Sequence, residues 1–251
     1  MEGLEARRVD LIAAGSLFLE VAMDVFDFDE LTVSEWALRE GIVLDAIRRH
    51  DPADWSDDPR AIRRASVQGL ARRCNWNEQH ARQVAKLALS LFDGTRELHG
   101  MGADDRELLE YAAFLHDIGE HVSPTRHHKH GTYLVQNGRL RGFTPAEVQL
   151  LAATTRWHRR GNPSGGDEFG GVDEEQLRRL CALLRLADGL DRGRASVVDD
   201  LEVRVGASLV VVQVCARGDA ELELWGARRK RDLFEKVFDR DLELKVSPSR
   251  P

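Results

Sequence analysis

Two histidines and two aspartates stand where helices would turn their side chains toward the interior of the protein. His80 recurs with apolar residues at helical spacing, and Asp188 does the same later in the chain. The adjacent pair His116-Asp117 ends a third segment with an apolar inner face. Three helices would therefore each deliver a metal-type ligand inward. The apolar positions of these faces are Val84, Leu87 and Leu91, then Leu177, Cys181 and Leu184, and finally Leu109, Ala112 and Ala113.

Buried carboxylates need a compensating charge. Burying an unpaired aspartate costs several kcal/mol, so Asp117 and Asp188 require either a cation or dense hydrogen bonding. A divalent ion meets that need. Two imidazoles and two carboxylates suit Mn²⁺, Fe²⁺, Zn²⁺ or Mg²⁺, with positions left open for water or phosphate oxygens. The alternative is a hydrogen-bonded histidine core without turnover.

The elements that must position these residues are mostly helices. Thr144, Pro145 and Glu147 combine a capping box with proline at the first helical position, which is a strong helix start. Five helical segments without an intervening strand predict an all-α core. These segments lie near 59–74, 77–92, 104–118, 145–158 and 174–189.

The pattern changes from Ser196 onward. The segments 197–205, 208–216 and 220–227 alternate between apolar and polar residues, which predicts β-strands. Residues 228–238 are typical of a helix, and 242–246 predict a last strand. We therefore expect a small C-terminal α+β subdomain.

Before the helical core the sequence predicts a helix over 7–25, a short strand around Leu31-Thr32-Val33 and a helix over 39–47. An acidic stretch with two prolines follows and is the clearest linker. The predicted domains are an N-terminal segment 1–50, a linker 51–58, the helical domain 59–195 and the α+β subdomain 196–251.

Composition narrows the class of protein. The chain has 251 residues, of which 42% are apolar and 31% charged, as in an ordinary globular protein. We find neither a membrane-spanning apolar run nor a signal-peptide core, and we therefore expect a cytoplasmic protein. The three cysteines form no C-x-x-C pair, which argues against a disulfide framework and a cysteine-only zinc site.

The net charge of −7 argues against a general nucleic-acid binder. The stretch 126–163 is nevertheless basic, with seven lysines and arginines against one acidic residue, Glu147. An anionic ligand would be drawn there, although a solvated basic face is an equal interpretation. Nucleic-acid binding rests on this stretch alone and ranks last, because no aromatic interleaving or known motif accompanies it.

The order His80, His116-Asp117 and Asp188 resembles the HD phosphohydrolase superfamily. Further segments make the chain similar to the C-terminal half of the exopolyphosphatase/guanosine pentaphosphate phosphohydrolase family. The first fifty residues resemble the closing helix, strand and helix of that family's actin-like module. The segments that carry the resemblance include RRCNWNEQHARQVAKLALSLFD, LHDIGE, HHKHGTYLVQN, GFTPAEVQLLA, RWHRRGNP and LLRLADGLDRGR.

The resemblance implies a mainly α fold: an HD-type helical core, a C-terminal α+β subdomain and an N-terminal remnant of an actin-like domain. It places His116 and Asp117 in catalysis and adds His127 and His158 as metal ligands. His127 fits the superfamily's spacing better than its neighbouring histidines, and Glu120 stands where related signalling hydrolases have a lysine. Candidate phosphate-binding residues are Arg126, Lys129, Arg159, Arg160, Arg185 and Arg192.

Long members of the family begin with two actin-like lobes that carry glycine-rich phosphate loops, and these 251 residues lack them. We therefore expect the exopolyphosphatase active site to be incomplete here. The first hypothesis is a phosphohydrolase that binds a divalent metal and either polyphosphate or a phosphorylated nucleotide. The alternative is a non-catalytic or regulatory module that binds polyphosphate or guanosine polyphosphates and completes a separate actin-like half. A homodimer is expected in either case.

Overall fold

The computed structural model describes residues 9–31, 33, 38–39, 41–43 and 58–248. The chain divides into two units, Met1–Trp55 and Ser56–Pro251. The first unit contains α1, Val9–Phe26, on which many apolar side chains are exposed. The strand predicted at 31–33 is not found, because Leu31 and Val33 have no strand conformation and Thr32 lies outside the described residues. Most of the predicted helix 39–47 and linker 51–58 also lies outside them.

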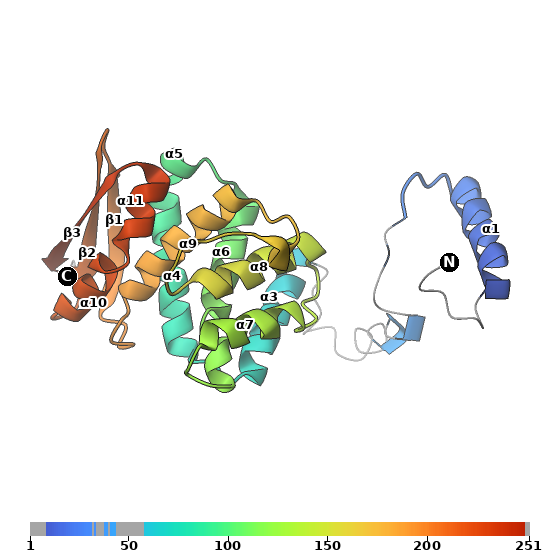
Figure 1. Ribbon diagram of the computed structural model, residues 1–251, viewed down its shortest axis with the longest axis horizontal. Coiled ribbons are helices and arrows are strands. Elements are labelled where there is room, and N and C mark those ends of the chain that lie inside the picture. The colour runs from blue at the N-terminus through green and yellow to red at the C-terminus, as the bar shows by residue number, and fades with distance from the viewer. Residues whose placement is uncertain (1–8, 32, 34–37, 40, 44–57, 249–251) are drawn as a thin grey trace. The chain divides into compact units, whose positions relative to one another are not determined.

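In the second unit all five predicted core helices are present. Polar caps start several of them: the Asn77 side chain accepts from the backbone N–H of His80 at 3.1 Å, and Thr144 accepts from the backbone N–H of Glu147 at 3.2 Å. The mainly α fold is therefore confirmed (Figure 1). The helices are α3 (Pro59–Arg73), α4 (Glu78–Gly94), α6 (Ala103–Leu115), α8 (Pro145–Trp157) and α9 (Glu174–Gly189).

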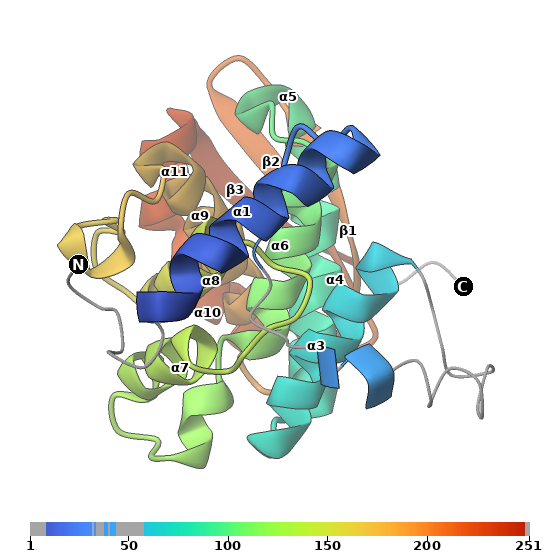
Figure 2. The same ribbon diagram turned by 90° about the vertical axis from the view of Figure 1, so that its right-hand side faces the viewer.

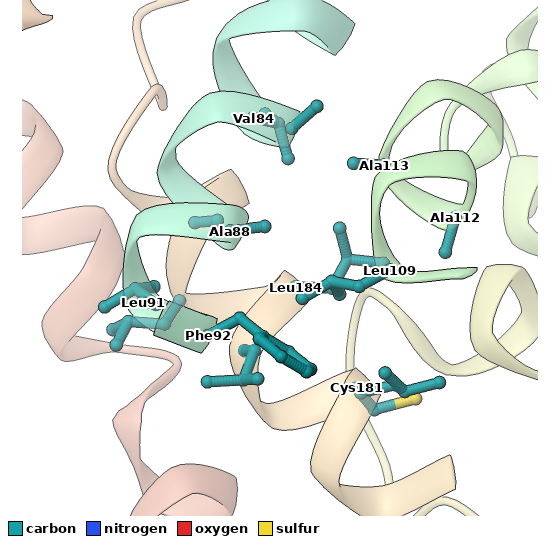
Figure 3. Close-up of a cluster of buried hydrophobic side chains, with 14 of the residues drawn as sticks. Val84, Ala88, Leu91, Phe92, Leu109, Ala112, Ala113, Cys181 and Leu184 are labelled. Carbon is teal, nitrogen blue, oxygen red and sulfur yellow. The ribbon is translucent and has the colours of Figure 1, made fainter. Parts of the chain in front are cut away.

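The centre of the unit is the contact among α4, α6 and α9. Figure 3 shows side chains of these three helices meeting in one apolar cluster, in which Leu91, Leu109 and Leu184 are fully buried. Burial of each such side chain contributes about 1.5–3 kcal/mol. The same helices carry the histidines and aspartates at their ends, so core packing fixes the positions of those residues.

The sequence did not predict a helix in the histidine-rich segment. The histidine-rich segment forms α7, His127–Gln136, which packs on α8 and on the short helix η3, Ile118–His121. Only three of its residues are buried, and two of them are Gly131 and Thr132. Because α7 has so narrow an apolar face, periodicity did not reveal it. Two further short helices are α5 (Arg96–His99) and η4 (Asp167–Phe169).

The C-terminal region is an α+β tail, as predicted. Strand β2 (Leu209–Ala216) pairs antiparallel with β1 (Val198–Val205) and parallel with β3 (Asp241–Pro248). The parallel connection from β2 to β3 contains α10 (Glu221–Arg228) and α11 (Arg231–Phe238). The strand predicted at 220–227 was therefore wrong, because that segment is α10.

The tail packs directly on the helical core. Strand β1 contacts α4, while α10 and α11 contact α9, as Figure 2 and Figure 1 show from two sides. Backbones meet where α9 approaches α10: a Cβ on Gly189 would lie 2.7 Å from Ala227 Cα, and one on Gly226 would lie 2.5 Å from the Gly189 carbonyl oxygen. This close approach brings the tail to the end of α9. None of the described helices is long and apolar enough to cross a membrane.

Candidate functional site

Helix ends converge on one cluster of histidines. His80 lies in the first turn of α4, His116 caps the C-terminus of α6, His127 starts α7 and His158 caps the C-terminus of α8. His80, His116 and His158 are at most 2% exposed. The ring centroid of His116 lies 5.2 Å from that of His80 and 5.3 Å from that of His158. Four imidazoles therefore share one buried region.

Each imidazole is oriented through its Nδ1 atom. His116 Nδ1 lies 2.7 Å from the Ala113 carbonyl oxygen, and His158 Nδ1 lies 2.7 Å from the Thr155 carbonyl oxygen. Because these carbonyls accept the Nδ1 proton, the Nε2 lone pair of each ring faces the cluster.

The rings of His80 and His127 are also held through Nδ1. His80 Nδ1 contacts Asp191 Oδ2 at 2.7 Å, and His127 Nδ1 contacts the Pro124 carbonyl oxygen at 3.2 Å. The Nε2 atoms of His80 and His116 are buried and have no hydrogen-bond partner. Hydrogen bonding within the protein therefore leaves these two nitrogens unsatisfied, which is unusual for buried polar atoms.

Two aspartates complete the cluster. Asp188, in the last turn of α9, places Oδ1 3.6 Å from His80 Nε2 and 3.9 Å from His116 Nε2. Asp117, directly after α6, places Oδ1 3.2 Å from His127 Nε2 and 3.5 Å from His158 Nε2. The six residues thus form two groups of three that could each hold a metal ion. The groups are His80, His116 and Asp188, and Asp117, His127 and His158.

Asp117 contacts both groups. Its second oxygen, Oδ2, lies 3.5 Å from His116 Nε2 and 3.8 Å from His80 Nε2. One carboxylate therefore faces two histidines with each of its oxygens. This is the position from which a carboxylate can bridge two metal ions.

The electrostatic environment keeps the carboxylates ionised. Burial opposes the charge of Asp117, but the surrounding His116, His127 and His158 outweigh burial and hold its pKa well below the usual range. Burial likewise opposes the charge of Asp188, and the ammonium of Lys230 together with His80 lowers its pKa. Both aspartates are therefore acceptor-only groups at neutral pH.

The histidines differ in charge preference. Burial lowers the pKa of His116, which favours the neutral ring that a metal requires. Burial would also lower the pKa of His80, but the nearby carboxylates of Asp188 and Asp191 raise it to about 9. In the absence of metal, His80 therefore carries a proton that a metal ion would displace.

Three further residues belong to the site and were not predicted. The Arg194 Nη2 donates to Asp117 Oδ2 at 2.7 Å, the Lys230 ammonium donates to Asp188 Oδ2, and Asp191 holds His80. Asp191 and Arg194 stand in the segment LLRLADGLDRGR, whose resemblance to the family was the available signal. Nothing in the sequence indicated Lys230, because it stands at the start of α11 and only the packing of α10 and α11 on α9 brings it near Asp188.

The predicted phosphate-binding residues fall into two kinds. Arg185 is 5% exposed, and its Nε and Nη2 atoms donate to the Trp157 carbonyl oxygen at 2.8 and 2.5 Å. It therefore holds the C-terminus of α8, and the predicted role as a phosphate ligand does not fit a guanidinium that is buried and bound to the backbone. The others are exposed: Arg126 and Lys129 beside His127, Arg159 and Arg160 beside His158, and Arg192 after Asp191.

The chain is thus a helical domain in which two groups of histidine and aspartate residues at the helix ends could each hold a metal ion. Residues 62–214 match Ppx/GppA phosphatase, domain III, and residues 1–50 match the Ppx/GppA phosphatase family. The chain belongs to the Ppx/GppA phosphatase family, which confirms the resemblance seen in the sequence.

A curated relative lies in the same family. The guanosine-5'-triphosphate,3'-diphosphate pyrophosphatase of Aeromonas hydrophila subsp. hydrophila is 28% identical over 196 residues. The alignment covers 74% of this chain and 37% of the relative. The chain therefore corresponds to just over a third of the length of that relative.

Proposed function

We propose that the six clustered residues hold two divalent metal ions and that this centre hydrolyses phosphate bonds in polyphosphate or a phosphorylated nucleotide. The observation that carries the proposal is the convergence of four Nε2 atoms on two carboxylates. A metal ion would satisfy the buried Nε2 atoms of His80 and His116, which lack partners within the protein. Asp117, with histidines beside both oxygens, would bridge the two ions.

The donor set favours some ions over others. Four imidazole nitrogens and two carboxylates suit Mn²⁺, Fe²⁺ or Zn²⁺, whereas Mg²⁺ prefers sites made only of oxygen. Among the four ions expected from the sequence, Mg²⁺ therefore ranks last for tight binding.

The bound ions would polarise a phosphate oxygen and lower the pKa of water toward ~7. The chain's own part is to fix ligands and to bring positive charge to the phosphates. His116 and Asp117 have the central positions, because the histidine is fully buried and the aspartate contacts both groups. Arg126 and Arg159, with the exposed cations beside them, would offset the charge of further phosphates.

The proposed substrate class is supported by the relative and by the basic stretch. The relative is named for an activity on a guanosine nucleotide that carries triphosphate and diphosphate groups. A chain of phosphates would also match the basic residues between 126 and 163.

The test measures metal and turnover together. Elemental analysis of the purified chain loaded with Mn²⁺ is expected to give about two ions per chain. Phosphate release from polyphosphate and guanosine pentaphosphate should then depend on Mn²⁺. Asp117→Ala should abolish both, whereas His121→Ala, a change at an exposed histidine on η3, should leave both unchanged. Absence of bound metal and of turnover would overturn the proposal.

A second candidate is a non-catalytic module that binds polyphosphate or guanosine polyphosphates and completes a separate actin-like half. The observation in its favour is that Asp117 and Asp188 are already paired with the cations Arg194 and Lys230. In that case the chain binds phosphate chains without turnover, with or without Mn²⁺.

We also propose that the chain forms a homodimer, and sedimentation equilibrium of the full chain would test this.

A further inference from the structure

Arg194 lies at the exposed side of the six clustered residues. Its Nη2 atom donates to Asp117 Oδ2 at 2.7 Å and to Glu120 Oε1 at 2.8 Å, while Nη1 donates to Glu120 Oε2 at 3.1 Å. The Arg194 side chain is 39% exposed, whereas Asp117 and Asp188 are each 17% exposed. The Arg194 guanidinium therefore lies between the partly buried Asp117 carboxylate and solvent.

Glu120 holds the guanidinium from outside the cluster. Both of its oxygens accept from Arg194, which is the paired geometry that a planar guanidinium favours. Among the described residues, the Glu120 carboxylate forms hydrogen bonds and an ion pair with Arg194 alone, whereas Asp117 also faces the histidines. The two carboxylates therefore differ: Glu120 is dedicated to Arg194, and Asp117 is shared with the candidate metal centre.

The loop that carries Arg194 is built around Asp191. The Asp191 carbonyl oxygen accepts from the backbone N–H of Arg194 at 2.9 Å, and Asp191 Oδ1 accepts from the backbone N–H of Ser196 at 2.8 Å. The other oxygen of the same carboxylate holds His80. One buried aspartate thus fixes both a candidate metal ligand and the loop that presents Arg194.

The loop also keeps an unfavourable backbone. Arg194 has a φ of 54° and Ser196 a φ of 53°, a left-handed conformation that side-chain-bearing residues rarely adopt. Such conformations persist only where the surroundings impose them, and they concentrate at functional sites. The side chain is therefore presented at a defined place.

A metal ion would compete with Arg194 for one oxygen. Asp117 Oδ2 accepts from Arg194 and also faces the Nε2 atoms of His80 and His116. A cation bound to Asp117 Oδ2 would make this oxygen a weaker acceptor, and the hydrogen bond from Arg194 Nη2 would weaken. Arg194 would then remain paired with Glu120 and have N–H groups available for an anion at the centre.

We propose that Arg194 is the residue that binds a phosphoryl oxygen at this centre, and that Glu120 is its positioning residue. The inference rests on the proposed function, because it supposes cations at Asp117. The competing interpretation is that Arg194 only neutralises Asp117 in the metal-free protein and has no part in ligand binding.

The experiment titrates inorganic phosphate into the full chain loaded with Mn²⁺, using isothermal titration calorimetry. Arg194→Ala should leave the number of bound Mn²⁺ ions unchanged and weaken phosphate binding about tenfold to a hundredfold, as expected for a charged hydrogen-bonding partner. Arg194→Lys should recover part of the phosphate affinity, because lysine restores the positive charge but not the paired N–H donors of a guanidinium. Glu120→Gln should give a smaller loss.

Arg106→Ala is the matched control. Arg106 is 42% exposed and forms a similar two-point pair with Asp93, at 2.8 and 2.7 Å, on the surface of α6. It should change neither Mn²⁺ content nor phosphate affinity. Thermal melting of each variant verifies that it is folded.

The outcomes separate this inference from the proposed function. Phosphate affinity within twofold of the wild type in Mn²⁺-loaded Arg194→Ala overturns the inference and leaves the metal centre intact. Tighter Mn²⁺ binding with unchanged phosphate affinity supports the neutralising role instead. If the wild-type chain binds no Mn²⁺, the proposed function fails. The metal-free titration then decides: loss of phosphate binding in Arg194→Ala upholds the inference, and equal or absent binding overturns it.

Discussion

At the scale of single residues, the candidate centre depends on the groups that hydrogen-bond to the Nδ1 atom of each histidine and so orient its ring. Three imidazoles are oriented by backbone carbonyls, which no side-chain substitution removes. His80 alone is oriented by a side chain, Asp191, which is fully buried. Asp191 is therefore the residue outside the six ligands whose loss should affect metal binding most.

Asp191→Asn removes the charge that fixes the His80 ring. We expect Mn²⁺ affinity to fall about tenfold to a hundredfold, as is typical when the partner of a ligating histidine is changed. The pKa of His80, which Asp188 and Asp191 raise to about 9 against the effect of burial, should fall as well, and histidine NMR titration would detect this. Asp93→Asn, at an exposed carboxylate, is the control. Unchanged Mn²⁺ affinity would show that His80 is not a ligand.

Four of the six ligand candidates, His80, His116, Asp117 and Asp188, could be predicted from the sequence because helical periodicity and the resemblance point to the same residues. The other two, His127 and His158, came from the resemblance alone. Asp191, Arg194 and Lys230 could not be derived from periodicity. Asp191 follows the end of α9, Arg194 lies in an irregular loop, and Lys230 comes from another subdomain. Their positions depend on tertiary packing, which spacing along one helix does not encode.

At the scale of elements, errors in prediction trace to residues that break the apolar pattern. The segment AELELWGA alternates like a strand, yet it forms α10 with Glu223 buried. The Glu223 carboxylate accepts from the backbone N–H of Gly193 at 3.1 Å, which satisfies the buried oxygen. A buried glutamate cannot be recognised from hydropathy, so the helical face was hidden.

Close packing of η3 against α7 positions His127 beside Asp117. A Cβ on Gly119 would lie 2.0 Å from the His127 carbonyl oxygen and 2.4 Å from the Gly131 nitrogen. Gly119→Ala should therefore separate the two helices, reduce bound Mn²⁺ toward one ion per chain and cost about 1–3 kcal/mol of stability.

Gly69→Ala is the control for this change, because a Cβ there would meet only Arg73 Nη1, at 3.7 Å, within α3. It should be neutral or slightly stabilising in urea unfolding. Retention of full Mn²⁺ content in Gly119→Ala would show that the second group does not depend on this packing.

The start of α8 is fixed to α3 through Glu147. Its carboxylate closes the capping box with Thr144 and accepts from Arg63 Nη2 at 2.8 Å. Burial opposes the charge of Glu147, but Arg63 and Thr144 outweigh it and lower the pKa from 4.5. The stabilisation is therefore complete above the unfolded-state value and is lost as the pH falls through the lowered pKa.

Glu147→Gln should reduce the free energy of unfolding by about 1–2 kcal/mol at pH 7, as expected for a lost cap and charged hydrogen bond. The difference from the wild type should shrink progressively below pH 4.5, once the wild-type carboxyl is protonated. Urea unfolding at pH 7, 5 and 3 measures it. A difference that stays constant over this range would exclude an electrostatic origin.

At the scale of the whole molecule, the second unit joins helical core and tail around the candidate centre. The core supplies the six ligand candidates, and the chain beyond α9 supplies Asp191, Arg194 and Lys230. Without metal, Arg194 and Lys230 compensate the charges of Asp117 and Asp188. The protein should therefore fold without metal and gain stability when metal binds.

Removing metal with a chelator tests whether the protein stays folded without metal and is stabilised by it. A ligand at a hundred times its Kd stabilises a protein by about 2.7 kcal/mol, and a domain of this size gains roughly 2–4 °C in Tm per kcal/mol. Thermal melting with excess Mn²⁺ should therefore exceed melting with EDTA by roughly 5–10 °C. Asp117→Ala should lose this difference, because the bridging carboxylate contacts both groups, whereas His121→Ala should keep it. Identical melting temperatures of the wild-type chain in Mn²⁺ and in EDTA would mean that the buried imidazoles serve packing alone. Complete unfolding in EDTA would mean that Arg194 and Lys230 do not compensate the charges of the aspartates.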